Sequence, residues 1–357
     1  MQAPGDVHSV ARRTDRSSGV CSMISFLERI ADDRPLLYDG GFGTELFAHG
    51  IELANSALAN ELYPDIVSSI HSDYIEAGAE VIGTNTFVAS YPHLEMAGKD
   101  ASESDGLIRL AVEHARAAIE RSERDVYLAG SIGPLPGAIE ADSGDTEFGI
   151  ANSIARDAHE RVGSLLAEGG VDFFCVETMF SANEAALAID ELRKFGLPIA
   201  VNLTYKYTKD RTTGEVIYKT DWGHSAADLL EILAGGAQSD GHDLLGHVQI
   251  VGLNCGAESR RDEHTGMPHA INGIGQLKRA METRQDPPKR MMAYPNAGKA
   301  RLDEQHRTYY ANTPEEMAAF VPDLLQAGAY FIGGCCGTGV AHIRAFREAM
   351  DRMDQAA

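Results

Sequence analysis

The amino-acid sequence predicts an α/β fold of the (β/α)8 class, a TIM barrel in a single domain. Eight short apolar runs alternate with amphipathic stretches along the 357 residues, which is the repeating unit of such a barrel. The runs are continuously apolar, as expected of parallel strands that are buried on both faces. A chain of this length commonly forms one barrel rather than two domains.

Each apolar run is followed by small or polar residues, which mark the end of a predicted strand. The predicted strands span residues 36–38, 81–83, 126–129, 173–176, 199–201, 248–251, 291–294 and 330–332. In a closed barrel the carboxyl ends of all strands converge on one face, where barrel active sites lie. Polar residues that follow distant strands are therefore expected to share one pocket.

The stretches between the strands carry helix start and stop signals. Helices are predicted over residues 24–31, 64–77, 153–168, 182–195, 314–327 and 340–353. Pro64 suits a first helical turn, and Asn152 and Thr313 are the predicted N-caps of their helices. A glycine directly follows four of these stretches, at Gly78, Gly169, Gly196 and Gly328.

An open, doubly wound sheet is the rival architecture. It would place a glycine-rich, dinucleotide-binding turn after the first strand. The segment at that point, residues 41–46, reads Gly-Phe-Gly-Thr-Glu-Leu and lacks the third glycine of the motif. The sequence therefore favours the barrel.

The chain is strongly acidic, with 53 Asp and Glu residues against 31 Lys and Arg residues and a formal net charge of −22. Nucleic acids and anionic membrane surfaces are bound by basic patches, so neither is an expected partner. No apolar run reaches the roughly 18 residues of a membrane-spanning helix. We expect the acidic residues to form a solvated surface.

Residues 1–22 are polar, lack periodicity and contain no apolar stretch of the kind found in signal peptides. They are predicted to be a disordered tail, and the barrel domain is predicted to span residues 23–357. The five cysteines are odd in number and include an adjacent pair, which does not fit a disulfide framework. A reducing, cytoplasmic setting is therefore expected.

Cys255, Cys335 and Cys336 are the candidate metal ligands, because each follows a predicted strand. Adjacent side chains of a regular strand point to opposite faces, but the glycines around the Cys335-Cys336 pair allow the backbone to leave strand geometry. Three thiolates and one open position are typical of a catalytic zinc site. From the residues alone, two other interpretations stay open: small buried core cysteines, and a redox-active vicinal disulfide.

Several motifs, taken in order along the chain, resemble the homocysteine S-methyltransferase family. The resemblance extends from about Leu36 to Phe346. It rests on Asp39-Gly40-Gly41-Phe42-Gly43-Thr44-Glu45-Leu46, on residues 77–87, on Glu177-Thr178, on Gly252-Leu253-Asn254-Cys255 and on Gly333-Gly334-Cys335-Cys336-Gly337.

The resemblance implies a (β/α)8 barrel that binds Zn²⁺ through Cys255, Cys335 and Cys336. It implies transfer of a methyl group from a small donor to the thiol of L-homocysteine, which gives methionine. Zinc ionises the thiol, and the leaving group departs neutral, so no further catalytic residue is expected. The expected partners are small molecules. The alternatives are a related thiol or selenol as acceptor, betaine as donor, or a barrel that binds zinc or thiols without catalysis.

The resemblance also implies substrate-binding residues. Glu177 is expected to bind the homocysteine ammonium; the alternative for Glu177 is a carboxylate held by backbone amides. Asp39 is expected to share that role, and the alternative for Asp39 is a simple turn residue. Thr84 and Asn85 are expected to contact substrate, or else to cap the end of their strand. Asn254 is expected beside the zinc ion or the substrate.

One position departs from the family pattern. Betaine-dependent members carry a tyrosine after the phenylalanine of the second-strand motif, and Val88 stands there in this chain. Because Val88 cannot bind zinc, we expect the fourth zinc ligand in the absence of substrate to be Asn254, water or Tyr91. A betaine cage needs aromatic rings, and the single tryptophan, Trp222, lies in residues 205–223, a segment expected to fold over the barrel mouth.

A free sulfonium such as S-methylmethionine is therefore the expected methyl donor. The chain ends one helix after the eighth predicted strand. That end point also leads us to expect no folate or cobalamin domains. Cys175 shares a strand with Glu177 and is expected to belong to the barrel core.

Overall fold

The computed structural model describes residues 23–256, 261–304 and 306–356. The tail predicted for residues 1–22 lies outside the described residues. Eight parallel strands form one sheet in the order β1-β12-β9-β8-β5-β4-β3-β2. These strands are β1 Leu36–Leu37, β2 Val81–Gly83, β3 Tyr127–Ile132, β4 Phe173–Met179, β5 Ile199–Leu203, β8 Val248–Cys255, β9 Arg290–Pro295 and β12 Phe331–Ile332.

A bridge between Tyr38 and Val81 joins the first strand to the second and closes the sheet into a barrel. The hydrogen bond from the Glu80 amide to the Leu37 carbonyl, 2.8 Å long, supports the same junction. The predicted (β/α)8 barrel is thus confirmed. All eight predicted strands are present, and most of them extend further toward their carboxyl ends than predicted.

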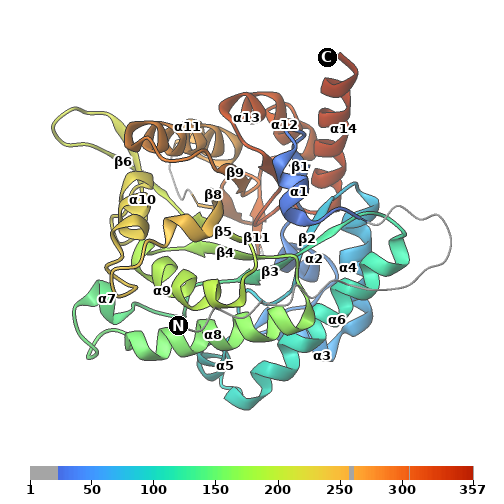
Figure 1. The fold of residues 1–357 in the computed structure, drawn as a ribbon. Helices are drawn as coiled ribbons and strands as arrows, with labels where there is room; N and C mark the ends of the chain where they lie inside the picture. The colour runs from blue at the N-terminus through green and yellow to red at the C-terminus, as the bar shows by residue number, and fades with distance from the viewer. Residues whose placement is uncertain (1–22, 257–260, 305, 357) are drawn as a thin grey trace, which may run out of the picture.

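Helices surround the sheet, with α8 and α9 on one side of it in Figure 1 and α11 and α13 on the other. The helices are α1 Phe26–Ala31, α2 Phe42–Ala48, α3 Ala59–Leu62, α4 Pro64–Glu76, α5 Tyr91–Met96, α6 Ser104–Ser122, α7 Glu140–Ser143, α8 Asn152–Gly169, α9 Ala182–Leu192, α10 Ala226–Gly235, α11 Gly266–Arg284, α12 Pro314–Ala318, α13 Val321–Ala327 and α14 Val340–Ala356.

Successive side chains along each strand belong alternately to two apolar clusters, one inside the barrel and one between the strands and the helices. Side chains such as Tyr38, Phe173 and Cys175 point inward and fill the barrel. Their neighbours, such as Leu37 and Phe174, point outward and pack against the helices. This alternation is the period of a strand buried on both faces, and it places Cys175 in the barrel core as expected.

Helix α1 closes the amino-terminal end of the barrel. Its Phe26 ring is stacked on Phe173, with centroids 4.2 Å apart, and meets Tyr127 edge-on at 5.3 Å. Ser25 caps the helix through a capping box with Glu28, which satisfies two backbone amides at the start of the helix.

The predicted helix caps are right at Thr313 and wrong at Asn152. Thr313 accepts a hydrogen bond from the Glu316 amide in a capping box. Asn152 is instead the first residue of α8, because its side chain accepts a hydrogen bond from the Ala141 amide, 3.0 Å away, and so ties α8 to α7. That tertiary contact outweighs the local capping preference.

Two antiparallel hairpins follow strand ends and were not predicted. The first pairs β6 Lys206–Lys209 with β7 Val216–Lys219, inside the segment expected to cover the mouth. The Tyr218 amide of this hairpin donates to the Gln276 side chain of α11 at 3.0 Å. The second hairpin pairs β10 Ala300–Leu302 with β11 Thr308–Tyr310.

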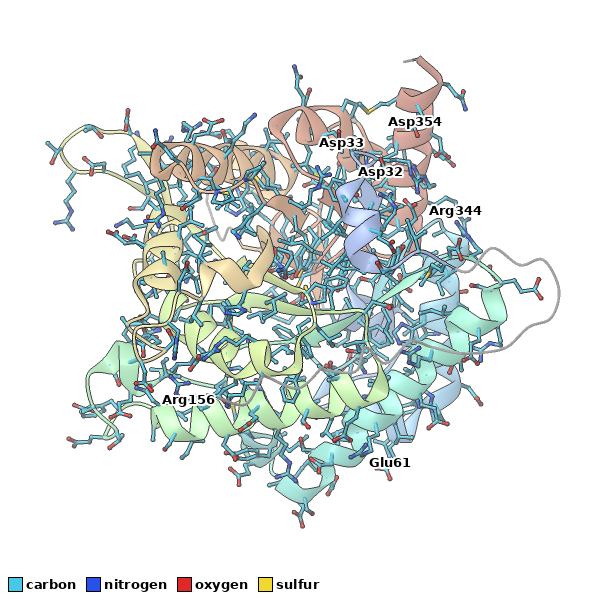
Figure 2. All side chains as sticks on the ribbon, viewed as in Figure 1. Asp32, Asp33, Glu61, Arg156, Arg344 and Asp354 are labelled. Atoms are coloured by element: carbon cyan, nitrogen blue, oxygen red, sulfur yellow. The ribbon has the colours of Figure 1, made fainter. Side chains whose placement is uncertain are left out.

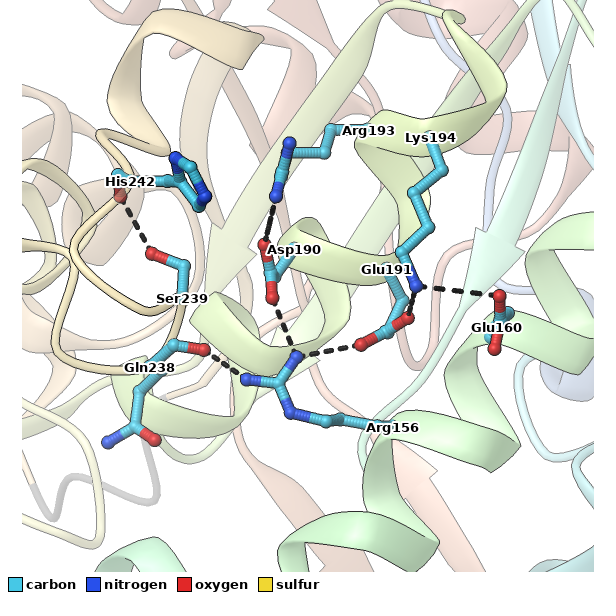
Figure 3. Close-up of polar contacts among 9 residues, drawn as sticks. All are labelled: Arg156, Glu160, Asp190, Glu191, Arg193, Lys194, Gln238, Ser239 and His242. Carbon is cyan, nitrogen blue, oxygen red and sulfur yellow. Dashed lines mark hydrogen bonds and ion pairs between the residues drawn. The ribbon is translucent and has the colours of Figure 1, made fainter.

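A charged cluster on the outside of the barrel joins α8 to α9. Figure 3 shows Arg156 between Asp190 and Glu191, at 2.7 Å from an oxygen of each. Arg156 also donates to the Gln238 carbonyl beyond α10, and Lys194 pairs with Glu191. The cluster therefore links α8, α9 and the segment that follows α10.

Acidic side chains on the solvated surface agree with the expectation from composition. Asp32, Asp33, Glu61 and Asp354 are exposed and labelled in Figure 2. Within the part of the chain that the structure describes, no helix is both long and apolar enough to cross a membrane.

We expect Phe26→Ala to lower the free energy of unfolding by about 3–5 kcal/mol, because it empties the buried space beside Phe173. Phe26 is 4% exposed, whereas Leu27, next to it on the same helix, is 54% exposed. Leu27→Ala is therefore the matched control and should change stability by no more than about 0.5 kcal/mol. Urea unfolding measures both, and equal effects would argue against α1 as part of the barrel core.

Candidate metal centre

The structure brings the three candidate cysteines together at the carboxyl ends of their strands. Cys255 ends β8, and Cys335 and Cys336 follow β12. Their sulfur atoms all lie within 4.8 Å of one another, and Cys255 Sγ is 3.9 Å from Cys336 Sγ. Among the described residues, this is the one group of three or more His, Cys, Asp or Glu side chains close enough to share a metal ion.

The backbone leaves strand geometry at both cysteine segments. β12 ends at Ile332, and Cys336 begins a turn completed by Gly337, whose φ is +81°. Cys255 itself has a φ of +53°, in the left-handed region that non-glycine residues seldom adopt. These bends turn both adjacent sulfurs of the Cys335-Cys336 pair toward the third, as the flanking glycines predicted.

Asn296 links the two cysteine segments. Its side-chain carbonyl accepts the Cys336 amide at 3.1 Å, and its amide group donates to the Gly256 carbonyl at 3.3 Å. The neighbouring Pro295 carbonyl accepts the Cys335 amide at 2.9 Å. The end of β9 therefore holds both segments in place. The sequence shows Asn296 only as a polar strand-end residue, and its role was missed.

Asn254 lies beside the sulfurs and is almost fully buried, with 1% of its surface exposed. Its amide group donates to Cys335 Sγ at 3.8 Å and to Thr178 Oγ1 at 2.7 Å, and its carbonyl accepts the Thr178 amide at 2.7 Å. Asn254 thus connects the end of β4 to the sulfur cluster. Its predicted contact with substrate stays a prediction.

The three thiols cannot all ionise without a counter-charge. Hydrogen bonds from Cys255 and then Cys335 hold the pKa of Cys336 well below its usual range. The hydrogen bonds of Cys335 to Cys255 and then to Cys336 raise the pKa of Cys335 well above its usual range. A divalent cation between the sulfurs would remove this conflict, because it stabilises every thiolate at once.

The cluster differs from Cys175, the core cysteine. Cys175 is fully buried, and its sulfur contacts Tyr294 Oη at 3.4 Å. The three clustered cysteines are partly exposed free thiols. Core packing alone therefore describes Cys175; Cys335 also packs against the inner core, but the three clustered cysteines remain partly exposed and their sulfurs lie close together.

Glu177 lies at the end of β4, close enough to Cys336 for their charges to interact. Ser131 donates a hydrogen bond to Glu177 Oε1, and Tyr294 donates one to Oε2 at 2.9 Å. Burial raises the pKa of Glu177, these two hydrogen bonds oppose the shift, and Cys336 adds to it. Hydroxyl groups, rather than the backbone amides of the alternative interpretation, hold this carboxylate.

Asp39 is the second carboxylate at the mouth and is 5% exposed. Its Oδ2 accepts the Gly83 amide at 2.8 Å. Burial raises the pKa of Asp39 well above its usual range, the Gly83 bond opposes the shift, and the charge of Glu177 adds to it. Asp39 and Glu177 therefore share one electrostatic environment.

Thr84 and Asn85 are buried and already bonded to the protein. Thr84 Oγ1 accepts the Ser131 amide at 3.1 Å and lies 2.7 Å from Thr86 Oγ1. The Asn85 amide group donates to Ser56 and Asn60, at 3.0 and 2.9 Å. These bonds favour the strand-end alternative, and the contact of either residue with substrate stays a prediction.

Tyr294, like Asn296, is a site residue that sequence reasoning missed. It was assigned only to a strand. Its inward position was available from the period-two alternation of residues 292 and 294. Which hydroxyl would reach Glu177 depends on the curvature of the closed sheet, which no local pattern encodes.

Fold and site together define a (β/α)8 barrel with a three-cysteine cluster, suited to a metal ion, at its carboxyl-terminal mouth. More narrowly, the chain belongs to the homocysteine S-methyltransferase family, whose family model matches residues 36–350. This confirms the resemblance found in the sequence, and members of the family are methyltransferases that act on small molecules.

Similar proteins are described as homocysteine or selenocysteine methyltransferases. Homocysteine S-methyltransferase 4 of Zea mays is 27% identical over 368 residues, which cover 97% of this chain and 94% of that protein. Selenocysteine Se-methyltransferase of Brassica oleracea var. italica is 27% identical, and the match covers 88% of each chain. The metallated form of the homocysteine methyltransferase MmuM from Escherichia coli shares the fold, with a TM-score of 0.65, 23% identity and coverage of 90% and 98%.

Proposed function

We propose that this chain is a zinc-dependent homocysteine S-methyltransferase that makes methionine from homocysteine and a small sulfonium donor. The observation that carries the proposal is the placement of three free thiols, all within 4.8 Å of one another, beside a carboxylate at the mouth of the barrel. A thiol amino acid offers one group for each: a sulfur for the metal and an ammonium for Glu177.

The residues fit zinc in number and kind. Three thiolates match the soft ligands that zinc prefers, and the small number leaves a position for substrate. Asn254 adds a hydrogen bond to Cys335, and Asn296 fixes the Cys336 amide. Such supporting contacts orient metal ligands and tune their charge.

Bound zinc would supply one chemical function, a thiolate nucleophile made from the substrate thiol at neutral pH. Cys255, Cys335 and Cys336 would hold the ion. Glu177 would bind the ammonium of the same substrate and so fix where its sulfur lies. The donor loses a methyl group from a cationic sulfur and leaves neutral, so the chain needs no proton donor for it. Alignment of the two substrates is the remaining contribution of the protein.

A sulfonium fits the mouth better than betaine does. A quaternary ammonium is usually held by several aromatic rings. Trp222 is 42% exposed beyond β7, and the position of the family tyrosine is occupied by Val88. This is why we place S-methylmethionine before betaine among donors.

A selenol is the second candidate acceptor. The observation that favours it is the similarity to the selenocysteine Se-methyltransferase of Brassica oleracea var. italica. Selenols and thiols both bind zinc as anions, so the proposed ligands serve either. A barrel that binds zinc or thiols without catalysis is the rival from another class, and it predicts no methylated product.

We expect about one zinc ion per chain, held by the three clustered thiols. Changing Cys255, Cys335 or Cys336 to alanine should abolish tight zinc binding and methyl transfer, because each change removes a charged ligand. Cys175→Ala is the matched control and should keep both. Elemental analysis of the purified variants measures this, and zinc retained in Cys336→Ala would exclude the assignment.

Glu177→Gln should weaken homocysteine binding about tenfold or more, since a charge-assisted hydrogen bond contributes roughly 1.5–3 kcal/mol. Zinc content should not change. The wild-type affinity should also fall as the pH falls through the raised pKa of Glu177, because the protonated acid no longer attracts an ammonium. This acidic fall should be absent in Glu177→Gln. Calorimetry measures both effects, with exposed Glu61→Gln as the control.

The donor is tested by methionine production from homocysteine. S-methylmethionine, S-adenosylmethionine, betaine and dimethylsulfoniopropionate are offered separately to the zinc-loaded protein. We expect S-methylmethionine to be used best, because it is a free sulfonium that needs no aromatic cage. Betaine as the best donor would overturn this choice and leave the zinc chemistry intact. No product with any donor, or with selenocysteine as acceptor, would favour the non-catalytic rival.

A further inference from the structure

Tyr310, the last residue of β11, lies directly against the cysteine turn. Its ring covers Gly337, the residue after Cys336, so closely that a Cβ added to Gly337 would overlap the ring. Gly337 has a φ of +81°, which also favours glycine. The ring is partly buried and packs against the outer core cluster. The turn and the hairpin thus fit together at this one contact.

The hydroxyl of Tyr310 faces the sulfur atoms. It forms a hydrogen bond with Cys336 and is close enough to Cys255 and Cys335 for their charges to act on it. The phenol oxygen therefore lies next to all three sulfurs of the cluster. A divalent cation at the sulfurs would favour an ionised oxygen at this point.

The two side chains that the sequence offered for the fourth ligand, Tyr91 and Asn254, are bonded to other residues. The hydroxyl of Tyr91 pairs with Asp157. Both ends of the Asn254 side chain are bonded to Thr178, at 2.7 Å each. Tyr310 was not considered from the sequence, because it lies in a hairpin that the strand pattern did not predict.

We propose that the Tyr310 oxygen is the fourth ligand of the metal when no thiol substrate is bound, and that the substrate thiol replaces it. The proposal rests on the proposed function, since it needs a metal at the three cysteines. The exchange requires Tyr310 to move. Five of the six residues in β10 and β11 are exposed, so few packing contacts oppose a shift of this hairpin.

The test uses the full-length protein loaded with Co²⁺, whose visible absorption reports the ligands around it. Without homocysteine, Tyr310→Phe should shift the spectrum and weaken metal binding about tenfold or more. With homocysteine bound, wild type and Tyr310→Phe should have the same spectrum, because the thiol fills the position in both. Tyr309→Phe is the matched control: Tyr309 is the adjacent residue of β11, is 44% exposed and should behave as wild type throughout.

X-ray absorption of the zinc-loaded wild type gives a second measurement that needs no variant. We expect three sulfur ligands and one oxygen ligand without homocysteine, and four sulfur ligands with it. Identical Co²⁺ spectra for wild type and Tyr310→Phe without homocysteine would overturn the role of Tyr310 and leave the proposed function standing. Failure of wild type to bind Co²⁺ or Zn²⁺ through its cysteines would overturn both.

Discussion

Closure of the eight-stranded sheet is the constraint on which the sulfur cluster depends. The Tyr38–Val81 bridge turns an open sheet into a ring, and in a ring the carboxyl ends of distant strands meet at one mouth. β9 lies between β8 and β12, the strands that precede the cysteines. That order explains why Asn296, at the end of β9, bonds to both cysteine segments. The positions of the three sulfurs thus follow from strand order.

The ionisable side chains described at the mouth of the barrel are acidic, so each becomes negatively charged when it loses its proton. Cys336, Glu177 and Asp39 are all acidic, and burial together with mutual repulsion raises the pKa of both carboxylates. Such a site is stabilised by cations, and two different ones are available to it, a metal ion and a substrate ammonium. Each lowers the cost of keeping the neighbouring acids ionised. Binding of the metal and binding of the amino acid are therefore expected to reinforce each other.

The sequence predicted the barrel from strong local signals, and it predicted the cysteine cluster from strand-end positions together with the family resemblance. Continuous apolar runs identify buried strands, and glycines around Cys335-Cys336 indicate where the backbone bends. The sequence did not predict Ser131 and Tyr294 as partners of Glu177, since those contacts cross the barrel interior. The cap at Asn152 was also wrong, because its tertiary contact with Ala141 outweighs a local preference. Long-range polar contacts were the part that residue patterns could not supply.

The amino-terminal end of the barrel is filled by aromatic rings. Phe26 of α1 lies on Phe173, and Tyr127 and Phe331 surround it, each no more than 4% exposed. These packed rings fill the amino-terminal end, so we expect substrates to enter the barrel from its carboxyl-terminal mouth. A shared entry route affects the order of binding: the substrate that binds deeper must bind first, and the product formed from it must leave last. If the acceptor sulfur binds at the cysteines as proposed and the donor binds outside it, homocysteine would have to enter before the donor and methionine would have to leave after the demethylated donor.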